Sequence, residues 1–115
     1  MNEIRAAELV AAERTRVESA LADLDDAIRD DGELQRQQTG EASEAGSTVD
    51  SAALAMGLAA DARDQLAAVG RAEERLAQGT YGLSVVSGAP IPVERLEAVP
   101  LAELTIEEQR RLERR

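Results

Sequence analysis

The segment YGLSVVSGAPIPVERLEAVPLAELTIEEQ, residues 81–109, has the layout of a small zinc-finger module. A four-ligand zinc site usually takes one Cys-x-x-Cys pair from each of two turns, because this spacing lets both sulfurs reach one tetrahedral ion. The equivalent gaps here run from Ser84 to Ser87 and from Thr105 to Glu108, and the chain contains no Cys and no His. Hydroxyls are poor zinc ligands and one carboxylate cannot hold the ion, so we expect a finger without metal.

Two features of the segment are expected to replace the metal, which contributes on the order of 10 kcal/mol to the folding of an isolated finger. Thr105 and Glu108 match a capping box, which would start a terminal helix and contribute about 1 kcal/mol. The remainder is expected from apolar side chains packed around Tyr81: Leu83, Val86, Ile91, Val93, Leu96, Leu101, Leu104 and Ile106. The alternative is a decayed module that folds poorly.

Upstream of this segment, apolar residues at coiled-coil spacing predict two long helices. The first apolar seam consists of Ala7, Val10, Arg14, Val17, Leu21, Leu24 and Ile28. The second seam, in a helix over about residues 50–77, consists of Ala55, Ala59, Ala62, Leu66, Val69 and Leu76, and Glu73 interrupts it. The many small residues of the second seam would allow the two backbones to approach closely.

Two helices joined by one connection pack most simply as an antiparallel pair. The reversal is expected within residues 37–48, which lack large apolar side chains, and Ser47 and Asp50 match a capping pattern for the returning helix. We therefore expect a mostly α fold: a long antiparallel helical hairpin (coiled coil) over residues 1–78, then a metal-free finger module and C-terminal helix over residues 79–115. Within this module, residues 80–86 have strand character.

Composition limits the function. A net charge of −10 argues against direct binding of nucleic acid, which depends on neutralising phosphates. No phosphate-binding Gly loop and no nucleophile–base pair is visible, so we expect neither an enzyme nor a cofactor. The charged N-terminus lacks the apolar region of a signal peptide, and no apolar run reaches the roughly 18 residues of a membrane span, so we expect a cytoplasmic protein without membrane contact.

Residues 79–109 resemble the C-terminal finger of the DksA/TraR family of bacterial RNA polymerase regulators. The positions that match the family pattern are Gly79, Thr80, Tyr81, Gly82, Gly88, Ile91, Arg95, Leu96, Ala98, Pro100 and Ala102. All four zinc-ligand positions depart from it, since they hold Ser84, Ser87, Thr105 and Glu108. With the predicted hairpin, the resemblance covers nearly the whole chain, and it implies a variant of this fold that lacks the ligand cysteines.

The resemblance also implies a function for the end of the hairpin. Family members insert this hairpin into the secondary channel of RNA polymerase, where an acidic tip motif, D-x-x-D-x-A, approaches the catalytic magnesium. An ungapped count places this motif on residues 41–46, so that Glu41 and Glu44 take the acidic positions and Gly46 takes the position of the Ala. The alternative is an ordinary exposed loop, because such loops are often rich in Glu, Ser and Gly.

These expectations leave three functions open: a transcription modulator acting through the secondary channel, a silent competitor for that channel, and a structural protein that homodimerises through its Ala-rich seam. A monomer is expected for the first two. The positions at which alarmone-responsive family members carry basic residues hold Ala68, Val99 and Gln109 here. None is cationic, so we expect no family-type response to guanosine tetraphosphate.

Overall fold

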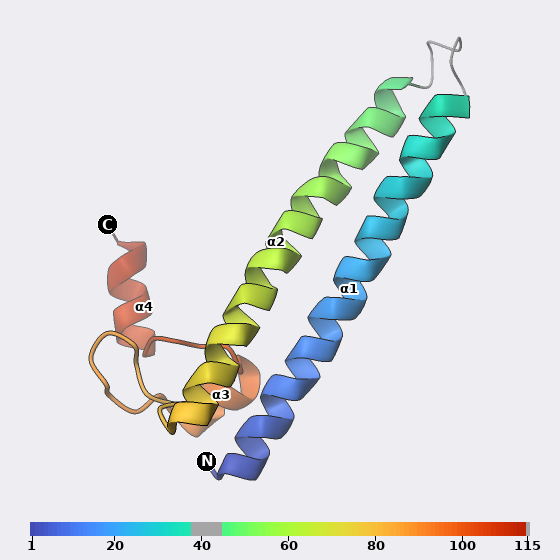
Figure 1. Cartoon of the computed structure of the whole chain (residues 1–115). Helices are drawn as coiled ribbons and strands as arrows, with labels where there is room; N and C mark the ends of the chain where they lie inside the picture. The colour runs from blue at the N-terminus through green and yellow to red at the C-terminus, as the bar shows by residue number, and fades with distance from the viewer. Residues whose placement is uncertain (38–44, 115) are drawn as a thin grey trace. The chain divides into compact units, whose positions relative to one another are not determined.

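Four helices make up most of the part of the chain that the structure describes. A computed structural model describes the backbone of residues 1–37 and 45–114, and the side chains of residues 1–30, 32 and 50–114. The helices in these ranges are α1 (Glu3–Gln37), α2 (Ala45–Gln78), α3 (Val93–Ala98) and α4 (Ile106–Glu113). α1 and α2 run antiparallel as a long helical hairpin (Figure 1). The predicted mostly α fold is confirmed.

The structure corrects two predictions of local conformation. α2 begins at Ala45, so Ser47 and Asp50 lie inside the helix and do not cap it. Small polar residues are tolerated in helix interiors, so a capping pattern alone does not fix a helix start. Residues 80–86 form turns and one isolated antiparallel bridge, from Leu83 to Pro90, and the described ranges contain no β-strand. Within those ranges, no helix is both long and apolar enough to cross a membrane.

Contacts group the residues into two compact units. We call residues 15–67 the hairpin unit, and residues 1–14 together with 68–115 the finger unit. α1 and α2 contribute to both units. The first part of α1 and the last part of α2 belong to the same unit as the finger residues. The proposed domain boundary between residues 78 and 79 stays a prediction.

Small buried residues and a few polar pairs hold the two helices of the hairpin unit together. Among the described side chains of this unit, the buried ones are Val17, Ala55, Ala59 and Ala62. The alanines of α2 allow close approach of α1, as their spacing predicts. Arg16 Nη2 donates to Gln65 Oε1 at 3.3 Å on one flank of the pair, and Arg63 Nη2 donates to Asp25 Oδ1 at 3.0 Å on another. These pairs fix the antiparallel register.

The finger unit has two small apolar clusters that share one residue. Val10, Val69 and Ala72 form the first, with Leu76, Tyr81 and Leu101 packed against it. Ile91, Leu96 and Ala102 form the second, and Tyr81 packs against this cluster as well. The single aromatic ring of the chain therefore joins the base of the hairpin to the finger residues.

The seam of α1 differs from the prediction at its beginning. Ala6 is buried, whereas Ala7 is exposed. The predicted seam used a seven-residue repeat, but a helix with 3.6 residues per turn places the buried position before Val10 four residues back. Further along, the two polar interruptions of the seams meet, because Arg14 donates from Nε and Nη2 to both carboxylate oxygens of Glu73 at 2.8 and 2.7 Å. This pairing holds the pKa of Glu73 below its ordinary value.

Candidate functional site

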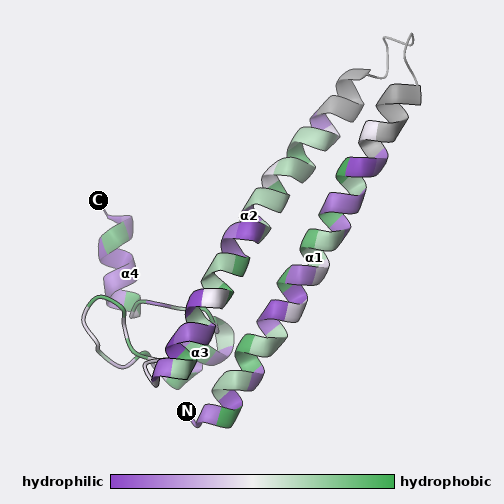
Figure 2. Cartoon of the chain, viewed as in Figure 1, coloured by the Kyte–Doolittle hydropathy of each residue, from purple (hydrophilic) through white to green (hydrophobic). Residues whose placement is uncertain are grey.

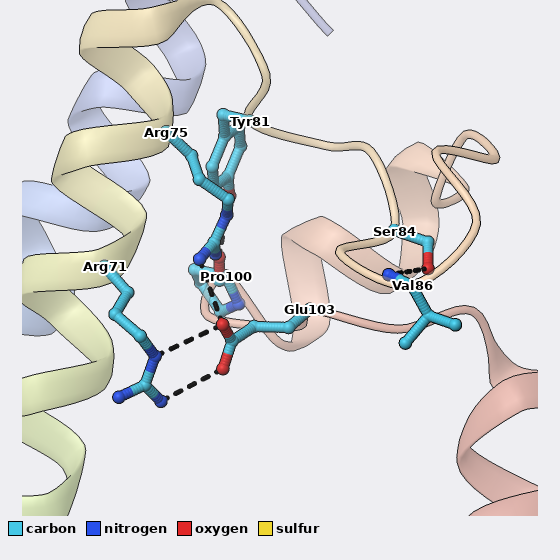
Figure 3. Close-up of polar contacts among 7 residues, drawn as sticks. All are labelled: Arg71, Arg75, Tyr81, Ser84, Val86, Pro100 and Glu103. Carbon is cyan, nitrogen blue, oxygen red and sulfur yellow. Dashed lines mark hydrogen bonds and ion pairs between the residues drawn. The ribbon is translucent and has the colours of Figure 1, made fainter.

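Ser84, the first of the former zinc-ligand positions, organises a tight turn. Its side chain is buried, and its Oγ accepts from the backbone N–H of Val86 at 3.1 Å (Figure 3) and from that of Ser87 at 3.2 Å. The turn is closed by Gly88 N–H donating to the Ser84 carbonyl at 2.9 Å. Gly88 has a φ of 74°, a left-handed conformation that side-chain-bearing residues seldom adopt.

The second pair of positions forms the predicted capping box at the start of α4. Thr105 N–H donates to Glu108 Oε1 at 2.9 Å, and Glu108 N–H donates to Thr105 Oγ1 at 3.2 Å. The capping-box prediction is therefore confirmed. The capping box gives hydrogen-bond partners to two backbone N–H groups that have none inside the helix.

The Glu108 carboxylate brings the two pairs together. Its Oε1 accepts from Thr105 N–H at 2.9 Å, and the hydroxyls of Ser84 and Ser87 act on the carboxylate as further donors. Because these donors stabilise the ionised form, they lower the pKa of Glu108 to about 2, the Ser84 hydroxyl having the largest effect. The four positions that would hold zinc in the family pattern thus form one hydrogen-bonded network, which we call the serine–glutamate network.

This network does not fit a zinc ion. A hydroxyl has two acceptor sites, and the Ser84 Oγ already uses both for the backbone N–H groups of Val86 and Ser87. The remaining donors are two hydroxyls and one carboxylate, whereas structural zinc takes thiolates and imidazoles. In the part of the chain that the structure describes, no group of three or more His, Cys, Asp and Glu side chains is arranged to hold a metal.

Glu103 joins the finger residues to α2. Arg71 donates from Nε and Nη2 to its two carboxylate oxygens at 3.2 and 3.0 Å, and Arg75 Nη1 donates to Oε2 at 3.1 Å (Figure 3). The hydrogen bonds from Arg71 are the main cause that holds the pKa of Glu103 below its ordinary value. The pairing of Glu103 with these two arginines was not predicted from the sequence. Arg71 and Arg75 lie four residues apart on one helix face, a spacing that could have indicated a shared carboxylate partner.

Tyr81 has a polar role as well as an apolar one. Its hydroxyl donates to the carbonyl of Pro100 at 2.8 Å, and burial raises the pKa of this hydroxyl. Pro100 is buried, so the hydrogen bond satisfies a carbonyl that has little access to water. Gly82 follows with a φ of 88°, and a Cβ built there would lie 3.4 Å from Leu96 Cδ1. The ring and this glycine together fix the path of the chain out of α2.

The predicted apolar cluster around Tyr81 is wrong in half of its members. Leu83, Val86, Val93 and Ile106 are exposed, whereas Ala102 is buried although it was not predicted. Val86 instead lines a pocket of ≈ 290 Å³ together with Leu104, Glu108, Arg111 and Leu112. The first and last residues of turns and short helices have few neighbours, so their apolar character does not imply burial. Tyr81 packs against a cluster from α1 and α2 as well as against the cluster of Ile91, Leu96 and Ala102.

The proposed contact residues at the hairpin tip are only partly described. Glu41 and Glu44 lie outside the described residues, and Gly46 falls in the first turn of α2. Their role in contacting polymerase stays a prediction. Of the three positions compared with alarmone-responsive proteins, Val99 and Gln109 line one pocket of ≈ 350 Å³, and Arg95 lines it too. The expected lack of an alarmone response also stays a prediction.

A comparison with solved structures shows the fold. The chain is similar to the solved structure of the transcription factor DksA2 from Pseudomonas aeruginosa, with a TM-score of 0.83, 24% identity, and coverage of 97% of this chain and 83% of that one. The chain has a DksA-like fold. No family model matches the chain. General stress protein 16O of Bacillus subtilis (strain 168) is 49% identical over 47 residues, which are 41% of this chain and 29% of that protein's length.

The DksA-like fold confirms the resemblance that residues 79–109 carry in the sequence. The hydrogen bonds from Val85 N–H to the Glu103 carbonyl at 2.9 Å and from Ser84 N–H to the Ala89 carbonyl at 2.8 Å hold the turn at residues 84–88 in place.

Proposed function

We propose that this chain modulates transcription by binding RNA polymerase, with the end of the α1–α2 hairpin entering the secondary channel. The observation that carries the proposal is the DksA-like fold over 97% of the chain, which includes the long hairpin and the finger-like module. The solved neighbour is a transcription factor. The net charge of −10 also suits a binding site lined with basic side chains better than one formed by nucleic acid.

In this proposal Glu41 and Glu44 act at the tip, near the catalytic magnesium of the polymerase, with Gly46 at the third motif position. Carboxylates there would change the stability of initiation complexes by competing for or repositioning charged groups. The finger unit serves as the rigid base, since Glu103, Arg71 and Arg75 join it to α2. No catalysis by the chain itself is involved.

A homodimer through the Ala-rich seam is less well supported, because Ala55, Ala59 and Ala62 are already buried inside the hairpin unit. Dimerisation through these residues would require the hairpin to open. The silent competitor remains an alternative that differs only in its effect on transcription.

Binding to purified bacterial RNA polymerase tests the proposal. The full-length chain, labelled with a fluorophore at Gln78→Cys, an exposed position at the end of α2, would be titrated with core enzyme and followed by fluorescence anisotropy. We expect saturable binding, and displacement by an unlabelled chain. Transcription in vitro, with and without the chain, separates a modulator from a silent competitor, because only a modulator changes the yield of transcript when the channel is occupied.

The tip is tested with Glu41→Ala/Glu44→Ala. The matched control is Glu3→Ala/Glu94→Ala, which removes two exposed carboxylates from the finger unit and gives the same net charge. We expect the tip variant to lose its effect on transcription and the control to keep it. Absence of polymerase binding by the unmodified chain would refute the proposal, and equal activity of the two variants would refute the role of the tip.

A further inference from the structure

The middle of the hairpin unit has an uncharged stretch that is not fully used in packing. Residues 51–60 of α2 contain no charged side chain, although the chain as a whole carries a net charge of −10. Ala55 and Ala59 are buried against α1, but the three largest side chains are not: Leu54 is 66%, Met56 55% and Leu58 46% exposed. Figure 2 shows hydrophobic colours along this part of α2 and hydrophilic ones on much of α1.

Two of these side chains share one flank of the hairpin. Leu54 and Leu58 lie four residues apart, and Leu58 precedes Gln65 by seven, so all three project from the same side of α2. Gln65 accepts from Arg16, which identifies this flank on α1 as well. Met56 lies on the opposite flank, because it precedes Arg63 by seven and Arg63 pairs with Asp25.

On α1, the flank of Arg16 continues to Asp23, Ala27 and Asp30, which follow at 7, 11 and 14 residues and are all exposed. On α2, exposed Asp61 follows Leu54 by seven residues on the same flank. We call Leu54, Leu58 and Ala27, with the carboxylates of Asp23, Asp30 and Asp61 around them, the leucine strip. Its composition is apolar at the centre and acidic at the edge.

A second copy of the chain does not suit this surface. Two copies placed strip to strip would bring carboxylates of the same sign together, which opposes association. The strip suits a partner that offers apolar side chains bordered by Arg or Lys.

We infer that the leucine strip is a docking surface for a partner protein, where Leu54 and Leu58 enter an apolar groove and the surrounding carboxylates pair with Arg and Lys side chains. The inference rests on the proposed function, in that the partner is RNA polymerase. Apolar contacts at the centre of an interface carry most of the affinity, and charges at the rim mainly raise the association rate. The strip would therefore supply affinity and the tip would supply the effect on transcription.

The test uses the full-length chain and purified RNA polymerase. In Leu54→Gln/Leu58→Gln we expect the dissociation constant to rise about tenfold or more, as for loss of a central contact. The matched control is Met56→Gln/Ala60→Gln, which places two glutamines four residues apart on the opposite flank and should change the constant less than twofold. Leu54→Ala/Leu58→Ala keeps helix propensity high and provides a second strip variant. Circular dichroism of each variant checks that the helices are intact.

The charged rim gives an independent readout. Asp23→Asn/Asp30→Asn should lower the association rate and weaken its dependence on salt, while the dissociation rate changes little. Binding of both strip variants at unchanged affinity would overturn the inference alone, because the unmodified chain still binds. Concentration-dependent dimerisation that both strip variants abolish, measured by analytical ultracentrifugation, would also overturn it. Failure of the unmodified chain to bind polymerase would overturn the proposed function.

Discussion

The finger unit and the hairpin unit use their apolar residues differently. In the finger unit, Val10, Val69, Ile91 and Leu96 are buried in two clusters that meet at Tyr81. In the hairpin unit, alanines form most of the buried seam, and the larger side chains of the opposite faces of α2 remain exposed. Both units leave some large apolar side chains exposed, so the difference lies in what is buried: large side chains in the finger unit and mostly alanines in the hairpin unit. Four predictions, from the largest expected effect to the smallest, test this difference.

The largest effect is expected from restoring thiolates to the finger unit. The variant with Ser84, Ser87, Thr105 and Glu108 all replaced by Cys should bind one zinc ion, because the structure brings these four positions together around Glu108. Zinc at 1,000 times its dissociation constant would raise the free energy of unfolding by about 4 kcal/mol. Metal analysis after purification and denaturation with and without a chelator measure both quantities.

The unmodified chain is the control for that experiment, and we expect it to retain no stoichiometric zinc. A zinc-to-protein ratio near one in the unmodified chain would contradict the metal-free finger. Hydrogen exchange would show whether the added protection stays within residues 1–14 and 68–115, as the division into two units predicts.

The next effect concerns packing. Leu96→Ala should lower the free energy of unfolding by about 3 kcal/mol, because Leu96 is 2% exposed and belongs to the buried cluster against which Tyr81 packs. Leu58→Ala, at a 46% exposed position, should lower it by less than about 1 kcal/mol. Chemical denaturation followed by circular dichroism compares the two, and equal losses would break the contrast between the units.

A smaller effect is expected at the serine–glutamate network. Ser84→Ala leaves the N–H groups of Val86 and Ser87 and the Glu108 carboxylate without their shared partner, at a cost of about 2 kcal/mol. Ser87→Ala removes one donor to Glu108 and one acceptor for Ala89, and it should cost less because Ser87 is exposed. Thermal unfolding of the two variants gives their order, and the reverse order would show that Ser84 does not organise the turn.

The smallest effect is a dependence on pH. The folded state lowers the pKa of Glu108 from its ordinary value of 4.5 to about 2, so ionised Glu108 stabilises the fold. This contribution is fully present above about pH 4.5 and is lost as the pH falls toward 2. The difference in stability between the unmodified chain and Glu108→Gln should therefore shrink as the pH is lowered from 6 to 3. Glu107→Gln removes a neighbouring carboxylate outside the capping box and controls for net charge.

Much of the fold could be predicted because it depends on repeating patterns. The spacing of Val10 and Val17 and the alanines at 55, 59 and 62 predicted the hairpin, and Thr105 with Glu108 predicted the start of α4. These signals are local or periodic, and the tertiary contacts of the fold are compatible with them. The family pattern of glycines also follows from backbone geometry, since Gly79, Gly82 and Gly88 all have positive φ.

What the sequence did not predict depends on contacts between distant segments. Glu103 and Glu97 are ordinary acidic residues in the sequence, yet Glu103 binds Arg71 and Arg75, and Glu97 accepts from Arg5 at 3.0 and 2.7 Å. Exposure of Leu83 and Val86 was missed for the same reason, because burial depends on what the tertiary fold places above a side chain. The convergence of Ser84 and Glu108 followed only once the turns were placed together.

The serine–glutamate network also determines which chemical conditions the finger withstands. Chelators remove the zinc ion from a thiolate site, and cysteine thiolates are oxidised in steps to sulfenic, sulfinic and sulfonic acids. Hydroxyls and a carboxylate undergo neither reaction under the same conditions, and the chain has no cysteine that could. A peroxide pulse or depletion of zinc would therefore leave the two turns and the start of α4 unchanged.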